Sequence, residues 1–375
     1  MVPRLRFPEF RDAGEWEEKR LGQICFSVRS DLSASELTDD GSYDVYGASG
    51  IAGKHKYYQE ESAYVAVVKD GSGAGRIFLC KPKTSVLSTL EKIKPSGDID
   101  LKFLYAILQT INLKAYSIGG AIPHVYFADY ANARISVPEK QEQQKIANIL
   151  LSIDKLIDLH TKKVELLKEQ KKGLMQRLFP REGERVPRLR FPEFRDAGEW
   201  EVKKLGEICE VLDNQRKPVA ADKRKKGPYP YYGASGVIDY IDNYLFEGRM
   251  ILIGEDGAKW GAFEKTAFIA EGKFWVNNHA HVLRAVDVVD VLIEKYLTMI
   301  DISLYVTGKA PPKLTLNNLK DIKIPIPIKK QEQQKIADFL SYLDELVELH
   351  TKKVELLKEQ KKGLMQRLFP REGDA

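Results

Sequence analysis

Apolar residues recur at alternating steps of three and four positions in two long stretches of the chain. This spacing continues for four heptads in each stretch and is typical of a helix that packs lengthwise against another helix. The first series is Leu150, Ile153, Ile157, His160, Val164, Leu167, Lys171, Leu174 and Leu178. The second series is Leu340, Leu343, Val347, His350, Val354, Leu357, Lys361, Leu364 and Leu368.

The pattern predicts two long helices, over residues 141–179 and 331–369. At 1.5 Å per residue each helix is about 58 Å long. Prolines stand just before and just after each predicted helix and favour these limits. A histidine and a lysine interrupt each apolar seam, and such polar residues often fix the register of a helix pair at some cost in stability. We expect antiparallel pairing, because a duplicated chain then acquires approximate two-fold symmetry.

The chain is an internal duplication. Residues 2–17 recur unchanged at 186–201, and residues 159–183 recur unchanged at 349–373. The segments between these repeats differ strongly in sequence. The chain therefore predicts one duplicated frame with two unlike inserts.

Each insert has the pattern of a compact mixed α/β domain. In the first, residues 63–68 and 76–80 are expected to form two strands around the glycine turn 70–75. In the second, residues 249–253 are expected to form a strand that returns at Ala262–Phe263 after the turn 254–261. Both inserts contain Tyr-Gly-Ala-Ser-Gly, at 46–50 and 232–236, and both have a short amphipathic helix, at 101–109 and 291–299. The two inserts should share a fold and differ in their loops.

Composition and charge narrow the class of protein. The chain has 375 residues, 43% of them hydrophobic and 30% charged, with a net charge of +5. No apolar run is long enough to cross a membrane, and an apolar signal core is missing, so we expect a cytoplasmic protein. Cys25 and Cys209 occupy matching places and suggest a buried thiol in each copy. The repeated tail is basic, which suggests an acidic partner or a polyanion, although a solvated helix face explains it equally well.

Motifs for catalysis or cofactor binding are absent from the sequence. There is no phosphate-binding loop of the G-x-x-x-x-G-K-[ST] type, and the glycines at 71–75 lead into a strand, so they favour a hairpin turn. His279 and His281 lie near two asparagines, but no Cys or Glu stands at the spacing of metal ligands. We expect neither a catalytic site nor a metal in this chain.

The pattern for nucleic-acid binding is stronger. Cations cluster around Asp222 and are followed at once by tyrosines, a combination that suits a loop contacting phosphates and base edges. A solvated lysine loop with core tyrosines is the alternative. The candidate DNA contacts are Lys54, His55, Lys56, Lys69 and Arg76 in the first insert, and Arg216, Lys217, Lys223, Arg224, Lys225, Lys226, Tyr231, Tyr232, Lys259 and Trp260 in the second.

Three repeated motifs carry a family resemblance. They are Val-Pro-Arg-Leu-Arg-Phe-Pro-Glu-Phe with Gly-Glu-Trp-Glu, Gln-Glu-Gln-Gln-Lys-Ile-Ala at 141–147, and Lys-Glu-Gln-Lys-Lys-Gly-Leu-Met at 168–175. With these motifs the whole chain resembles the specificity subunit of type I restriction–modification systems. The resemblance implies two target recognition domains joined by two long antiparallel helices, in an α+β fold with pseudo-two-fold symmetry. The expected segments are residues 1–140, 141–180, 181–330 and 331–375.

The same resemblance implies the partners. Each recognition domain would read one half of a split sequence in double-stranded DNA, while the helices set the spacing and dock two methyltransferase subunits. Restriction subunits would complete the nuclease. S-adenosylmethionine, ATP and Mg²⁺ are then expected in those subunits, with no cofactor in this chain. A coiled-coil scaffold without DNA binding and a stand-alone DNA-modifying enzyme are the two rival interpretations.

Overall fold

The computed structural model describes residues 1–120, 122–308 and 311–370. The predicted end of the C-terminal segment, residues 371–375, lies outside this range. The chain forms two compact units. The first unit contains Met1–His160 and the chain from Lys352 onward, and the second contains Thr161–Thr351. Each unit therefore combines one insert with a part of both long helices.

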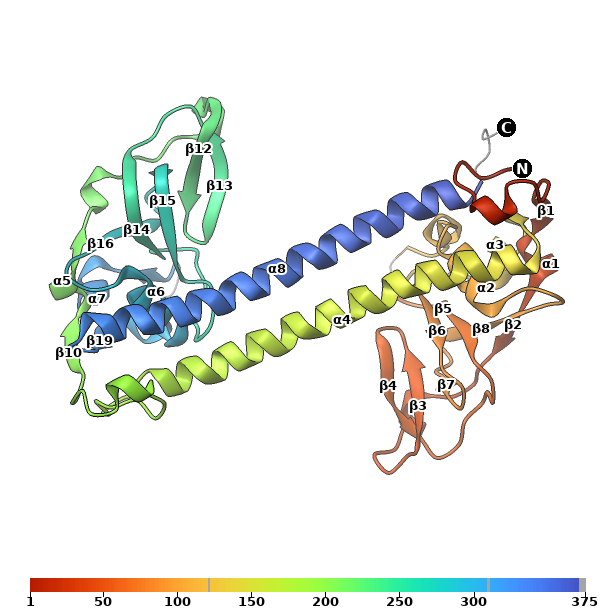
Figure 1. The fold of residues 1–375 in the computed structure, drawn as a ribbon, viewed down its shortest axis with the longest axis horizontal. Coiled ribbons are helices and arrows are strands. Elements are labelled where there is room, and N and C mark those ends of the chain that lie inside the picture. Colours follow the sequence, from red (N-terminus) through yellow and green to blue (C-terminus); the bar gives the residue numbers. More distant parts are fainter. Residues whose placement is uncertain (121, 309–310, 371–375) are drawn as a thin grey trace. The chain divides into compact units, whose positions relative to one another are not determined.

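The first unit is built around a four-stranded sheet with the order β2-β8-β5-β6, which is antiparallel throughout. A three-stranded sheet, β4-β3-β7, and a two-stranded sheet, β1-β9, complete it (Figure 1). The strands are β1 Glu17–Arg20, β2 Cys25–Arg29, β3 Tyr43–Gly47, β4 Gly50–His55, β5 Tyr64–Val68, β6 Ile77–Cys80, β7 Ser85–Val86, β8 Leu90–Pro95 and β9 Arg134–Val137. The short helices are α1 Leu21–Ile24, α2 Leu101–Leu108 and α3 Phe127–Tyr130.

The second unit repeats this topology with one fusion. Its sheet has six strands in the order β11-β16-β14-β15-β12-β13. The long strand β15 pairs with β14, as β6 pairs with β5, and also with β12, as β7 pairs with β3, so it joins the two sheets into one. The strands are β10 Glu201–Lys204, β11 Cys209–Val211, β12 Lys226–Gly233, β13 Gly236–Ile241, β14 Phe246–Gly254, β15 Ala267–Val276, β16 Ala280–Ala285, β17 Val306–Thr307, β18 Lys313–Leu314 and β19 Lys323–Ile326. The short helices are α5 Leu205–Ile208, α6 Asp290–Met299 and α7 Leu316–Lys320. The predicted common fold of the two inserts is confirmed.

One predicted strand is wrong. Ala262 and Phe263 lie in the connection between β14 and β15, and the return strand begins only at Ala267. Phe263 has φ +62°, a left-handed conformation that a strand residue does not adopt. The glycine turn of this insert is therefore part of a longer loop, residues 255–266, whereas the equivalent connection in the first insert is residues 69–76.

The insert of each unit, called its head from here on, has an apolar core between its main sheet and its amphipathic helix. In the first unit the core includes Val65 and Val67 of β5 and Phe103 and Leu104 of α2, all buried. The three cysteines are also buried and free, as predicted for Cys25 and Cys209. Burial raises the pKa of each cysteine thiol to about 12, so these thiols are inert at neutral pH.

The two long helices are α4 Lys140–Leu178 and α8 Lys330–Leu368, each beginning and ending one residue before the predicted limit. The predicted seam positions are buried or half-buried without exception. Several leucines outside the seam are exposed, including Leu159 and Leu166 on α4 and their twins Leu349 and Leu356 on α8. Among the described helices, none is long and apolar enough to cross a membrane.

The helices pair in antiparallel fashion within each unit. In the first unit Leu150 of α4 shares a core with Leu364 and Leu368 of α8, while Asp154, one turn later in α4, pairs with Lys361, one turn earlier in α8 (Figure 1). In the second unit Lys171 pairs with Asp344, and Leu178 shares a core with Leu340. The predicted direction of pairing is confirmed in both units.

The repeated N-terminal segment fastens each head to the start of a long helix. Arg6 donates two hydrogen bonds, of 2.9 and 2.8 Å, to the Glu142 carboxylate. Its twin Arg190 donates two of 2.7 Å to Glu332. All four side chains are buried. The two parallel hydrogen bonds in each pair are the bidentate geometry in which a guanidinium binds a carboxylate most strongly. The repeated sequence therefore forms the same arginine–glutamate contact in both units.

Candidate nucleic-acid interface

The main cationic surface lies on the connection between β11 and β12, residues 212–225. Lys217, Lys223 and Lys225 are exposed there, and Lys226 is exposed at the start of β12. They carry no ion pair with any residue that the structure describes. Because their charges are not neutralised within the chain, they remain available for phosphate oxygens.

Arg224 holds this connection in place and is not one of the free cations. Its guanidinium lies 4.5 Å from the centre of the Tyr231 ring, and its Nε donates to the carbonyl oxygen of Val219 at 3.0 Å. The Val219 amide donates in turn to the Tyr231 hydroxyl at 3.0 Å. Trp275 fixes a second point, since its Nε1 donates to the carbonyl oxygen of Lys217 at 2.6 Å. The lysines are therefore presented by an anchored loop.

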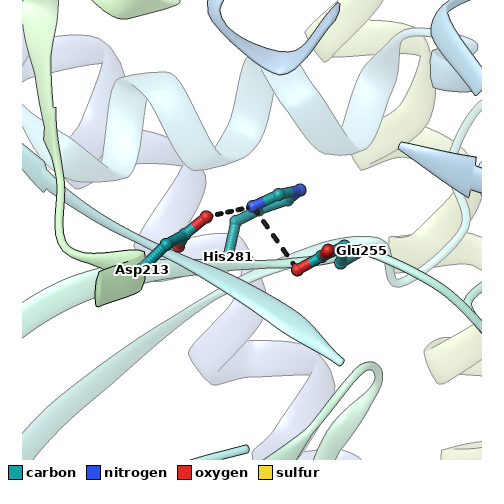
Figure 2. Close-up of side chains that lie close together, drawn as sticks. All are labelled: Asp213, Glu255 and His281. Carbon is teal, nitrogen blue, oxygen red and sulfur yellow. Dashed lines mark hydrogen bonds and ion pairs between the residues drawn. The ribbon is translucent and has the colours of Figure 1, made fainter. Parts of the chain in front are cut away.

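A buried cluster of charged residues contacts the start of the same loop through Arg216 and Asp213. Arg216, predicted as a DNA contact, instead pairs with Glu255 at 2.5 Å and with Asp213 at 3.3 Å, and its side chain is mostly buried. Lys313 pairs with Glu255 at 2.7 Å. Figure 2 shows His281 beside the two carboxylates, with its Nδ1 2.6 Å from Asp213 and 3.8 Å from Glu255. Arg216 is thus engaged inside the head.

This cluster was not predicted from the sequence. No Cys or Glu stands near His281 at metal-ligand spacing, but the fold brings in Asp213 and Glu255 from distant positions. Ligand atoms of these three residues lie within 4.8 Å of one another, the geometry that a metal would require. Only β-sheet pairing of β16 with β11 and β14 creates this proximity, so no local spacing could have revealed it.

The hydrogen-bond chemistry of the cluster favours a structural role over metal binding. Nε2 of His281 lies 2.8 Å from the carbonyl oxygen of Leu314, which can only accept, so Nε2 carries a proton. Nδ1 lies 2.6 Å from the Asp213 carboxylate, so both ring nitrogens already have hydrogen-bond partners within the head. The two carboxylates are already paired with Arg216 and Lys313, so the charges of the cluster are satisfied without an ion.

The carboxylates of the cluster are held in their charged form. Burial alone would raise the pKa of Asp213, but the hydrogen bond from His281 and the nearby charges lower it overall. Burial likewise opposes ionisation of Glu255, whose pKa is nevertheless lowered by Lys313 and Arg216. The cluster therefore ties β14, β16, β18 and the start of the cationic loop together at neutral pH.

The first head carries a different surface at the same topological position. Its β2–β3 connection, residues 30–42, contains four acidic residues and no lysine or arginine, whereas residues 212–225 contain five cations and two acids. Three of the predicted contacts in this head are exposed cations at other positions: Lys54 on β4, Lys56 just after it and Arg76 just before β6. Lys56 forms an exposed ion pair with Asp40 at 3.2 Å, and the Arg76 guanidinium donates to the Ala48 carbonyl at 3.2 Å.

Two other candidates in this head are partly enclosed. Lys69 is half-buried and lies 3.7 Å from Asp70, whose other oxygen receives Nδ1 of His124 at 2.7 Å. His55 is half-buried as well, and its Nδ1 accepts from the amide of Tyr57 at 3.2 Å. Their contact with DNA stays a prediction.

Three aromatic candidates lie in or against the core. Tyr231 is 1% exposed and Trp260 is 8% exposed. The indole Nε1 of Trp260 also donates to the carbonyl oxygen of Gly254. Both rings are buried and have their polar atoms bonded internally, which favours a core role, and their contact with DNA stays a prediction. Tyr232 is half-buried, and its ring centre lies 5.7 Å from that of Phe268 and 5.6 Å from that of Phe274. Lys259 is exposed and remains a candidate.

Exposed side chains on two edge strands were also missed. Ile51 on β4 is 58% exposed, and Ile238 and Tyr240 on β13 are 54% and 55% exposed. The strands β4 and β13 are equivalent in the two heads, and both end a sheet. Alternation along the strands placed some side chains outward, but the sequence did not tell which face was covered. Apolar and aromatic groups on an exposed edge suit contact with bases.

The two heads share a topology, and each is joined to both long helices. Their charged loops differ, so the chain has the form of a duplicated binding protein with two different surfaces. A family model described as the type I restriction modification DNA specificity domain matches residues 13–169 and again residues 197–359. The chain belongs to this family.

Individual relatives agree with that assignment. The chain is 28% identical to the type I restriction enzyme MjaVIII specificity subunit of Methanocaldococcus jannaschii, over 97% of this chain and 93% of the relative. It is 38% identical to a candidate type I restriction enzyme specificity subunit of Haemophilus influenzae, over 40% of this chain and 39% of that protein. The fold matches the crystal structure of the type I restriction–modification S subunit from Mycoplasma genitalium with a TM-score of 0.75, over 99% and 100% of the two chains at 18% identity.

Proposed function

We propose that this chain is the DNA-recognition and assembly subunit of a type I restriction–modification complex. In this proposal the first head reads one half of a split target in double-stranded DNA, and the second head reads the other half. The chain performs no chemistry itself. Two methyltransferase subunits dock on it, and restriction subunits join through them.

The observation that carries the proposal is the contrast between two equivalent connections. The heads share a topology, yet residues 30–42 are acidic and residues 212–225 are cationic. Surfaces of opposite charge at one position cannot contact the same DNA sequence in the same way. The target is therefore asymmetric, and the cationic loop contributes more phosphate contacts than its counterpart.

The long helices supply the spacing between the half-sites. Each helix has 39 residues, about 58 Å at 1.5 Å per residue. Half-sites one turn of B-DNA apart have centres about 34–36 Å from each other, a distance shorter than either helix. The exposed leucines on both helices, with the basic residues around them, support protein docking.

The cofactors of the reaction belong to the partners in this proposal. S-adenosylmethionine serves the methyltransferase subunits, and ATP with Mg²⁺ serves the restriction subunits. This division of labour rests on the family to which the chain belongs and on the absence of catalytic motifs from its sequence.

The test is a footprint of the assembled complex on DNA. The chain and its methyltransferase subunits should protect two short segments separated by an unprotected spacer. Protection without sequence preference, or no protection at all, would favour a scaffold that does not bind DNA. Methyl transfer or cleavage by the purified chain alone, supplied with S-adenosylmethionine and Mg²⁺, would show a stand-alone enzyme.

A further inference from the structure

A groove of about 950 Å³ opens on the first unit between α8 and the head. Ile107, Gln109 and Ala115 line it from the head, and Lys362, Met365 and Phe369 line it from α8. The α8 residues belong to the segment that is repeated unchanged in α4. The second unit therefore has the same helix surface, and the two copies can be compared position by position.

The heads can be aligned at this place by one shared contact. Gln143 accepts a hydrogen bond from the amide of Asp100, and its twin Gln333 accepts one from the amide of Val289. Counting nine residues onward from these amides matches Gln109 of the groove with Thr298. In the repeated helices Lys362 of the groove matches Lys172.

In the second unit Phe263 occupies the matching place. Its amide donates to the carbonyl oxygen of Thr298 at 2.8 Å, and Nζ of Lys172 lies 4.8 Å from the centre of its ring. Phe263 packs against the core that includes Met175 and Phe179. Phe263 thus contacts Thr298 through its backbone and Lys172 through its ring. These two residues are the counterparts of Gln109 and Lys362 in the groove.

The burial of a repeated methionine agrees with this comparison. Met175 in the second unit is 1% exposed, whereas Met365, in an unchanged sequence context, is only half-buried. Because the helix sequence is the same, the difference comes from what each head packs against it. In the second unit the loop of residues 255–266 places Phe263 against this helix and its core.

The backbone of Phe263 shows that its ring is held firmly. A bulky residue at φ +62° is strained and persists only when surrounding contacts enforce it. Contact of the ring with the core and with Lys172 provides this compensation. The second unit thus shows which chemical group this helix surface accepts.

Charge around the open groove defines the rest of the occupant. Lys358 and Lys362 line it, are exposed, and form no ion pair with any residue described by the structure. Lys361 is already neutralised by Asp154. Arg134 shares only an exposed contact of 3.5 Å with Glu18. An occupant with carboxylates next to its aromatic ring would satisfy these cations.

We propose that this groove docks an aromatic side chain from an acidic segment of a methyltransferase subunit. The inference rests on the proposed function, which supplies that partner, and it adds that the two docking sites are unequal. The first unit receives the ring from the partner. The second unit provides its own ring, Phe263, and offers the partner a closed surface instead.

The experiment titrates the full chain with the methyltransferase subunit of the same host, by calorimetry and native mass spectrometry. The unaltered chain should bind two subunits in two steps of different affinity. Ala115→Trp fills the groove from an exposed position, and it should weaken the tighter step at least about 30-fold, the effect of losing a central aromatic anchor. The matched control is Leu304→Trp, at the equivalent, 83% exposed position of the second unit, and it should change neither step.

A charge variant guards against a folding defect. Lys362→Glu removes a groove cation from an exposed position and should weaken the same step, while Lys172→Glu should leave that step unchanged. Two equal steps that neither Ala115→Trp nor Lys362→Glu alters would overturn the inference and leave the proposed function standing. Failure of the unaltered chain to bind any methyltransferase subunit would overturn the proposed function itself.

Discussion

Nζ of Lys361 on α8 lies 2.7 and 2.8 Å from the two carboxylate oxygens of Asp154 on α4. The same lysine donates to Oε1 of Gln109 in the head at 2.8 Å. Its side chain is 13% exposed and that of Asp154 is 26% exposed. One polar residue within the apolar seam thus joins both long helices and the head. The duplicated Lys171 repeats the arrangement with Asp344, which also pairs with Lys295 of the second head at 2.8 Å.

Removing one partner of this joint should destabilise the first unit. Asp154→Ala leaves a mostly buried ammonium group without its carboxylate, and we expect a loss of about 3 kcal/mol in the free energy of unfolding. Denaturant unfolding followed by hydrogen exchange of the first unit would measure it. Lys358→Ala, at an exposed position on α8 near Lys361, is the control and should change stability by less than about 0.5 kcal/mol. An Asp154→Ala loss no larger than that of the control would refute a structural role for the pair.

Acid should weaken the buried cluster of the second head. The folded pKa values of Asp213 and Glu255 lie below their ordinary values of 3.8 and 4.5. Their stabilising contribution is therefore complete above these ordinary values and is lost as the pH falls through the lower folded ones. Asp213→Asn and Glu255→Gln should each lower the unfolding midpoint of the second unit at pH 7, and the gap to the unaltered chain should close below about pH 4.

The exposed carboxylate variant Glu264→Gln is the control for this pH series and should unfold like the unaltered chain at every pH. A gap that persists undiminished at low pH would mean that the effect comes from packing, not from charge.

The cationic loop should contribute charge to DNA binding. Replacing Lys217, Lys223 and Lys225 with alanine removes three exposed cations, and the slope of log affinity against log salt should fall by about 1 for each phosphate that the loop no longer neutralises. Binding measurements over a salt series would determine it. Glu36→Ala, Asp39→Ala and Asp40→Ala in the acidic connection of the first head should not lower that slope. An unchanged slope in the lysine variant would place the phosphate-binding residues elsewhere.

Shortening the helices should shorten the spacer alone. Deleting residues 161–167 and 348–354 removes one heptad from each helix and retains both seam ion pairs, Lys361 with Asp154 and Lys171 with Asp344. Seven residues rise about 10 Å, the length of roughly three base pairs at 3.4 Å each. Sequencing of methylated DNA from cells with the altered chain should show a spacer about three base pairs shorter between unchanged half-sites. Changed half-sites would contradict the division between heads and helices.

The helical frame was predictable because its determinants are local. The alternating seam, the flanking prolines and the exact repeats locate both helices to within one residue. Lys171 and Lys361 stood out as polar residues in an apolar seam. Their acidic partners did not, since Asp154 and Asp344 lie just outside the seam and are identified only by antiparallel register.

The surface of the heads was much less predictable. Arg216 looked like an ordinary member of a lysine-rich loop, and only the pairing of β16 with β11 and β14 shows that acidic groups hold it inside. Tyr231 and Trp260 belong to residue types that serve cores and interfaces equally. Their burial depends on which face of each strand is covered, and that is decided by contacts between residues far apart in the chain.

The central claim is that two unlike heads each read one half of the target. The most direct measurement replaces residues 202–330 with the corresponding insert of a relative that has a different target, and maps the methylated sites of cells carrying the chimaera with its methyltransferase subunits. The account predicts that one half-site changes, while the other half-site and the spacer length stay as they were. A change in both half-sites, or methylation of the original target, would contradict it.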